Sequence, residues 1–252
     1  MQTKSAYFTK VRLWKEDDTR NFLPSKDITR NSMTCKHYNM KQIKVPYIAE
    51  AETLSFDDLD KVMETEGAKD FISEVNWEEF PYKPAVSFRI ARSESHLVII
   101  YNVRGLDLRA AALEDNGSVW EDSCCEFFIS HPTDGTYYNF ELNCIGTLLA
   151  AKRRSRNDAD MFGHEELSRI IRHTTLERKE YEENGSIYCW SNAIAIPFDL
   201  MGMDATALPA SARANFYKCA DKAAHPHYLS WNRIEIPSPD FHRPDFFGEL
   251  VF

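Results

Sequence analysis

The segment Tyr137-Tyr138-Asn139-Phe140-Glu141-Leu142-Asn143-Cys144 shows the clearest two-residue alternation in the chain. Side chains point alternately to the two faces of a β-strand, so every second residue shares a face. One face therefore carries Tyr138, Phe140, Leu142 and Cys144, which are suited to a core. The other face carries Tyr137, Asn139, Glu141 and Asn143. This polar row indicates either a concave binding surface or an ordinary solvated sheet face.

The segments around this strand repeat the same kind of pattern. Short apolar or alternating runs are separated by turn residues such as Glu114-Asp115-Asn116-Gly117 and Pro132-Thr133-Asp134-Gly135. Further strands are expected at 86–90, 97–101, 187–198, 213–219 and 247–252. One short helix is predicted over 56–66, with Ser55 as its N-cap. Many short strands with turns between them predict an all-β protein, a two-sheet sandwich resembling a jelly roll with immunoglobulin-like layering and short helices.

Charge separates the first part of the chain from the rest. The protein has 252 residues and a net charge of −9, yet residues 1–40 hold eight Lys and Arg against four Asp and Glu. These residues show no sustained periodicity. We therefore expect an N-terminal extension at 1–40, outside the fold, and one domain at 41–252. The acidic total disfavours a nucleic-acid partner.

Cysteine usage and hydropathy bear on location. The six cysteines have no CxxC spacing, and five lie in apolar strand-like runs, which favours buried thiols over a disulfide framework. No apolar run is long enough to span a membrane, and no hydrophobic signal core is seen at the N-terminus. The sequence as written predicts a cytoplasmic protein without a membrane partner, or a secreted one if the true N-terminus differs. The oligomeric state stays open.

An ordered set of motifs resembles the carbohydrate-binding modules of family 9 and their bacterial relatives. Val119-Trp120-Glu121-Asp122-Ser123-Cys124-Cys125-Glu126 is similar to the family's Trp-x-Asp-Ser-x-x-Glu strand, and Tyr137-Tyr138-Asn139-Phe140-Glu141 to its next strand. Ile194–Phe198, Arg213–Cys219, Leu229–Asn232 and Phe246–Leu250 complete the series over roughly residues 41–252. The resemblance implies a β-sandwich that binds sugars, often attached to glycoside hydrolases in carbohydrate catabolism. No hydrolase domain accompanies it here.

Sugar sites combine an aromatic face with polar groups that hold hydroxyls in a fixed direction. Trp120 and Trp231 are the predicted stacking residues, although both could be core tryptophans. The polar ligand contacts are predicted to come from Asn139, Glu141, Asn143 and Asn232. Polar support is expected from Asp122, Glu126, Arg89, Arg213 and Lys218.

Glu126 stands among cysteines and phenylalanines, so it is expected to be buried and paired with Arg89, Arg213 or Lys218. A second hypothesis makes Glu126 and Glu141 the acid and base of a glycoside hydrolase. A third is a sandwich interaction domain without a sugar ligand. No catalytic residue, metal ligand or cofactor is assigned. Calcium stays open, because Asn157-Asp158-Ala159-Asp160 followed by Gly163 partly matches a calcium loop.

The extension leads to the first testable prediction. A chain that begins at Met40 should melt within a few degrees of the full chain, because residues 1–39 lack the apolar periodicity of packed elements. Thermal melts followed by circular dichroism measure this. A larger fall would mean that the extension contributes more than about 1 kcal/mol to stability.

Overall fold

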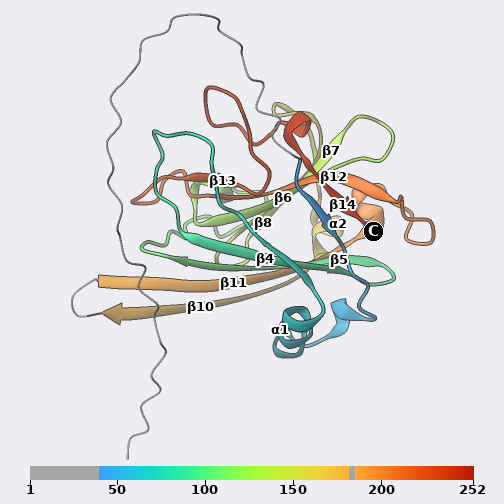
Figure 1. The fold of residues 1–252 in the computed structure, drawn as a ribbon, viewed down its shortest axis with the longest axis horizontal. Helices are drawn as coiled ribbons and strands as arrows, with labels where there is room; N and C mark the ends of the chain where they lie inside the picture. The colour runs from blue at the N-terminus through green and yellow to red at the C-terminus, as the bar shows by residue number, and fades with distance from the viewer. Residues whose placement is uncertain (1–39, 182–184) are drawn as a thin grey trace, which may run out of the picture. The chain divides into compact units, whose positions relative to one another are not determined.

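The computed structural model describes residues 40–181 and 185–252, which form two β-sheets packed face to face (Figure 1). The larger sheet has nine described strands. Seven follow one another in space: β1 (Gln42–Lys44), β14 (Gly248–Val251), β12 (Ser211–Cys219), β6 (Cys124–Ser130), β7 (Tyr137–Asn143), β8 (Leu148–Ser155) and β9 (Asp158–Met161). In addition, β13 (Tyr228–Ser230) pairs with β12, and β3 (Glu74–Val75) pairs with β13. The smaller sheet has five in the order β10 (Ile171–Tyr181), β11 (Gly185–Pro197), β5 (His96–Gly105), β4 (Ala85–Arg92) and β2 (Ala68–Phe71). The predicted all-β sandwich is confirmed.

The helices are short. They are α1 (Phe56–Thr65), α2 (His164–Ser168) and four 3-10 turns: η1 (Ala51–Thr53), η2 (Val119–Glu121), η3 (Phe198–Met201) and η4 (Pro244–Phe246). The Ser55 hydroxyl accepts a hydrogen bond from the Asp58 amide at 3.3 Å, which confirms the predicted cap. Leu59 and Met63 are the buried residues of α1. None of the helices in the described ranges is long and apolar enough to cross a membrane.

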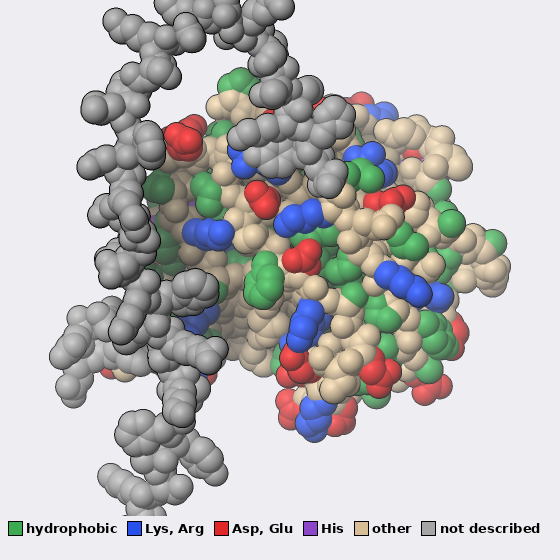
Figure 2. Space-filling model, in the orientation of Figure 1, with side chains coloured by type: hydrophobic (Ala, Val, Ile, Leu, Met, Phe, Trp, Pro, Cys, Tyr) green, Lys and Arg blue, Asp and Glu red, His purple; other side chains and the backbone are tan. Residues whose placement is uncertain are grey.

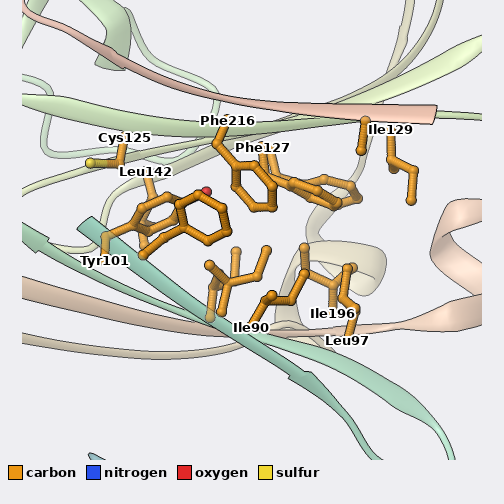
Figure 3. Packing of buried hydrophobic residues seen from close by; sticks show 14 of the residues in the cluster. Ile90, Leu97, Tyr101, Cys125, Phe127, Ile129, Leu142, Ile196 and Phe216 are labelled. Atoms are coloured by element: carbon orange, nitrogen blue, oxygen red, sulfur yellow. The ribbon is translucent and has the colours of Figure 1, made fainter. Parts of the chain in front are cut away.

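The main core lies between the two sheets (Figure 3). Ile90, Leu97, Tyr101 and Ile196 project from the smaller sheet toward Cys125, Phe127, Leu142 and Phe216 of the larger one. The apolar face predicted for 137–144 is part of this core, since Tyr138, Phe140, Leu142 and Cys144 all belong to it. Phe88 stacks on Phe216 across the interface with ring centroids 3.9 Å apart.

The opposite face of the larger sheet is also covered. A second apolar cluster lies there, and it includes Trp77, Phe128, Tyr217, Phe241 and Phe247. It joins the outward side chains of β6, β7 and β12 to the loops that precede η4 and surround β13. The larger sheet is therefore buried on both faces over its central strands, and the predicted polar row at 137–143 is not a solvated face.

The described residues belong to one compact unit. The extension predicted at 1–40 lies outside the described residues except for Met40. Cys124, Cys125, Cys144 and Cys219 are buried free thiols, and Cys189 is partly buried. On the face seen in Figure 2, basic and acidic side chains lie interspersed among apolar ones.

A buried lysine contacts a buried histidine at the end of β12. Lys218 Nζ donates to the Cys219 carbonyl at 2.5 Å and lies 3.0 Å from His227 Nε2. His227 Nδ1 lies 2.7 Å from the His225 carbonyl, so it carries the ring proton and Nε2 accepts from Lys218. Burial, together with the nearby Lys218 charge, lowers the pKa of His227 to about 3.

This histidine makes stability depend on pH. Between a folded pKa of about 3 and the ordinary value of about 6.5, the unfolded chain binds a proton at this site that the folded chain refuses. Stability should therefore fall as the pH is lowered, with His227 contributing about 2 kcal/mol of loss by pH 5. His227→Gln keeps an acceptor for Lys218 and cannot be protonated. Its unfolding free energy should change less between pH 7 and pH 5 than that of the wild type.

Urea titrations at both pH values measure this difference. The neighbouring His225 is half exposed, so His225→Gln is the matched control and should keep the wild-type slope. Identical slopes for wild type and His227→Gln would contradict the argument.

Candidate functional site

A pocket of about 320 Å³ opens on the outer face of the larger sheet. Strands β6, β7, β8 and β12 supply its floor, while η2, β13 and the loop 239–242 supply its rim. Its volume lies at the lower end of the range typical of small-molecule sites. The lining combines carboxyl, guanidinium and aromatic groups: Trp120, Glu126, Glu141, Arg153, Arg156, Asn157, Cys219, Asp221, Tyr228, Pro239, Asp240, Phe241 and His242.

Strand register brings the floor residues together. Glu126 of β6 lies directly opposite Glu141 of β7, and on its other side β6 pairs with β12 so that Cys124 lies opposite Cys219. Glu126 is 3% exposed and Glu141 is 4% exposed. Cys219 Sγ donates to Glu126 Oε1 at 3.0 Å. The two predicted glutamates therefore do lie in one pocket, side by side on its floor.

Glu126 has no cationic partner among the described residues, and the predicted ion pair is wrong. Lys218 is opposite Cys125 in the β6–β12 pairing, and residues 125 and 126 point to opposite faces of the sheet. Lys218 therefore faces the core while Glu126 faces the pocket. Burial, with nearby Cys219 and Glu141 adding to it, raises the pKa of Glu126 well above its ordinary value, which favours the protonated carboxyl.

The two arginines named as partners lie elsewhere. Arg89 is on β4 in the smaller sheet, where it forms ion pairs with Asp60 and Glu64 of α1. Arg213 Nε donates to the carbonyls of Phe247 and Gly248 and ties β12 to β14. Neither lines the pocket, so their predicted role in supporting the ligand site is not borne out by their positions.

Glu141 is held by a short hydrogen-bonded chain. Asn139 Nδ2 donates to Glu141 Oε1 at 2.8 Å, and Arg153 Nε donates to Asn139 Oδ1 at 2.8 Å. The second carboxyl oxygen, Oε2, is buried without a hydrogen-bond partner. Burial raises the pKa of Glu141 to about 7, against the lowering effects of Asn139 and Arg153. Asn139 is thus a positioning residue behind the pocket wall.

Trp120 stands at the rim. It lies in η2, it is 38% exposed, and it lines the pocket, while its predicted stacking on a sugar stays a prediction. Its carbonyl accepts from the Asp221 amide at 3.2 Å and from Cys219 Sγ at 3.5 Å, which anchors η2 to the end of β12. Nearby, burial raises the pKa of Asp221 to about 6, while a hydrogen bond from Tyr228 lowers it.

Trp231 is a core residue, and its predicted stacking role is corrected. It is fully buried, with edge contacts to Phe88 and Phe216, and its Nε1 donates to Asp70 at 2.7 Å. A Cβ atom on Gly248 would come within 2.5 Å of the indole ring, so the glycine makes room for it. A ring enclosed in this way cannot face a ligand.

The remaining predicted polar residues have structural positions. Asn143 and Asp122 form one buried network: Asn143 Nδ2 donates to Asp122 Oδ2 at 3.0 Å, and the same oxygen accepts from the amides of Ala111 and Ala112. Asn232 accepts from the Lys41 amide and donates to the Phe246 carbonyl, far along the chain from the pocket residues of β6 and β7. Asn143 and Asn232 therefore do not line the pocket, and Asp122 secures the loop that leads into η2.

Two groups of side chains have the carboxyl or thiol donors that metal ions bind. The partial calcium motif is strand β9, where Asp158 and Asp160 both pair with Arg154 at 2.8 Å and are exposed. This arrangement is not a calcium loop. At the pocket floor, one ligand atom each from Cys124, Glu126 and Cys219 lies within 4.8 Å of the others, and all three residues are buried.

Several pocket residues were not predicted from the sequence. Arg153, Asp221, Tyr228 and the loop 239–242 reach the pocket from separate segments. No local pattern in Pro239-Asp240-Phe241-His242 marks it as part of the pocket, and the pairing of Cys124 with Cys219 depends on a strand register that the sequence does not contain.

The chain matches a known protein family and is similar to solved structures. The family model described as "Carbohydrate-binding family 9" matches residues 57–252. A Bacteroides uniformis structure, provisionally assigned as carbohydrate-binding, is 34% identical over 84% of this chain and 99% of its own, with a TM-score of 0.76. A family 9 module from Caldicellulosiruptor kristjanssonii in complex with cellotriose is 12% identical over 84% and 93% of the two chains, with a TM-score of 0.52. No curated protein matches the chain.

Glu126 has no cationic partner among the described residues, and this predicts how a substitution behaves. Breaking a buried ion pair costs roughly 3–5 kcal/mol, but Glu126 contacts a thiol and no cation. Glu126→Gln should therefore change the free energy of unfolding at pH 7 by less than about 1 kcal/mol. Urea midpoints in chelator-treated buffer measure the change.

Asp122→Asn is the matched control. Asp122 is equally buried but accepts three N–H groups and lies 3.3 Å from Arg109 Nε. It should lose roughly 3 kcal/mol or more. Equal losses in the two variants would show that Glu126 is ionised and paired in solution.

Proposed function

Since the chain belongs to carbohydrate-binding family 9, we propose that it binds a mono- or oligosaccharide in the pocket on the larger sheet, without chemistry of its own. The observation that carries the proposal is the composition of this pocket. Trp120 offers an exposed aromatic face at the rim, buried carboxyl groups lie on the floor, and the partly exposed Arg153 lies beside them. We further propose that the protein serves carbohydrate catabolism in a bacterium, beside glycoside hydrolases.

The floor is suited to hydroxyl groups. Each sugar hydroxyl both donates and accepts, and the protonated Glu126 can do the same. Glu141 Oε2 is buried and unpartnered, so it gains a hydrogen bond when a hydroxyl reaches it. A buried acceptor of this kind costs free energy while it has no partner. The rim aromatic then covers the apolar CH face of the ring and excludes water.

The position of the two glutamates favours binding over hydrolysis. A glycoside hydrolase needs its two carboxyl groups on either side of the scissile bond. Glu126 and Glu141 lie opposite each other in the register of neighbouring strands and project from the same floor. A sugar above them therefore meets both carboxyl groups from one side.

Trp120 provides the test. Truncating a buried aromatic anchor can cost about 2 kcal/mol, so Trp120→Ala should weaken sugar binding roughly thirtyfold while the fold is kept. Calorimetry with glucose, cellobiose and cellotriose, preceded by a glycan array to find the best ligand, measures the affinity.

Phe71→Ala is the control, because Phe71 is 63% exposed and is not among the residues that line this pocket. It should bind as the wild type does. Wild-type affinity in Trp120→Ala would place the sugar elsewhere. Absence of any glycan ligand would favour an interaction domain, and turnover of chromogenic glycosides would favour a hydrolase.

A further inference from the structure

The floor of the pocket holds two thiols beside Glu126 that the proposed sugar contacts do not use. Cys124 and Cys219 lie opposite each other in the β6–β12 pairing, and Glu126 follows two residues after Cys124 on the same face. Their Sγ and carboxyl oxygen atoms all lie within 4.8 Å of one another. Three neighbouring positions on paired strands fix this triangle, so the donors are held together before any ligand arrives.

A second observation points to a ligand at the same place. Glu141, opposite Glu126 in register, is 4% exposed, and its Oε2 atom has no hydrogen-bond partner. Both glutamates line the pocket. Native proteins satisfy nearly all buried polar atoms, and an unpartnered carboxyl oxygen beside two thiols and a second carboxyl group is one that a cation or its bound water would satisfy.

We propose that this floor is a binding site for one thiophilic divalent cation of the zinc class, with Cys124 Sγ, Cys219 Sγ and a Glu126 carboxyl oxygen as ligands. Two sulfur donors and one oxygen match the borderline-soft character of zinc. Calcium and magnesium require six or more oxygen donors, which this triangle lacks. The fourth position faces the pocket, where water held by Glu141 or a ligand hydroxyl can occupy it.

The geometry needs little adjustment. Zinc–sulfur bonds of about 2.3 Å and zinc–oxygen bonds of about 2.0 Å in a tetrahedron put neighbouring donors about 3.5–3.8 Å apart. Cys219 Sγ now lies 3.0 Å from Glu126 Oε1, so these atoms must part by about half an ångström. Both thiols and the Glu126 carboxyl release their protons to solvent when the metal binds, and no electron is transferred.

The site is separable from the proposed sugar contacts. Cys124 does not appear among the residues that line the pocket, whereas Glu126 and Cys219 do. Substituting Cys124 therefore removes a metal ligand without changing the surface that faces a sugar. Trp120 is the converse, since it contacts the pocket and offers no metal donor side chain. The cation site stands even if the sugar proposal fails.

The experiment titrates the full chain, reduced and stripped with a chelator, with Co²⁺ and with Zn²⁺ alone. One cobalt ion per chain should bind, giving the near-ultraviolet thiolate-to-cobalt charge-transfer absorption and the visible bands of tetrahedral cobalt, and Zn²⁺ should displace it. Native mass spectrometry should show one zinc per chain. Cys124→Ser and Cys219→Ser should each lose the charge-transfer intensity of one thiolate and bind zinc at least about tenfold more weakly.

Cys189→Ser is the matched control, because Cys189 is a partly buried cysteine of β11 in the other sheet. It should keep wild-type cobalt spectra, and so should Trp120→Ala. If a serine variant fails to fold, Glu126→Gln replaces it and should weaken zinc binding by a similar factor with both thiolate bands retained. The proposal would be overturned if the wild-type protein bound no stoichiometric zinc, or if Cys189→Ser weakened zinc binding as much as Cys124→Ser does. A Cys124–Cys219 disulfide that persists under reductant would also overturn it.

Discussion

Burial of the larger sheet on both faces is the constraint on which the rest of this structure depends. One face packs against the smaller sheet, and the other lies under loops that carry their own apolar cluster. Polar side chains on that outer face cannot reach bulk water, so each must find a partner or lose its charge. Asp122 is paired with amides and Arg109, Glu141 with Asn139, and Glu126 lies beside a thiol where burial raises its pKa.

The same constraint leaves one of two tryptophans in the core and the other partly exposed at the pocket. Trp231 follows β13 and turns into the core, where Asp70 accepts its indole N–H and Gly248 leaves space for the ring. Trp120 lies in the 3-10 turn η2, which precedes β6 in the chain, where the covering loops end. Its backbone is fixed to the end of β12 and its side chain is left partly exposed. A tryptophan beside polar residues in sequence can therefore have either role, and only the path of the covering loops decides which.

The alternation of 137–144 was enough to predict the strand, its core face and the sandwich, because a period of two is a local property of the chain. Trp120 and Glu141, predicted as ligand contacts, and Glu126, predicted as support, line one pocket, and their roles in binding stay predictions. The partner of Glu126 could not be predicted. Whether Lys218 meets it depends on a strand pairing between segments 93 residues apart, and a shift of one residue would exchange the faces.

The 239–242 loop was missed for a related reason. Its residues reach the pocket only because Phe241 stacks on Tyr217 with ring centroids 4.2 Å apart, and that contact joins segments whose proximity has no local signature. Asn143 was assigned to the ligand from its place in the polar row of 137–143, and Asn232 from its place after Trp231. Burial turned both toward backbone groups instead.

The anchoring of η2 to the end of β12 has a consequence for how the protein matures. Trp120 and Cys219 are 99 residues apart, and Glu126 and Cys219 are 93 apart, yet the β6–β12 pairing brings all of them to one pocket. Long-range strand pairings form late and slowly, because a large loop must close before the contacts are gained. In a chain whose β6–β12 pairing has not yet formed, the residues of the pocket lie apart and there is no binding site. Any ligand of the pocket therefore recognises only the completed fold and draws the folding equilibrium toward it by mass action.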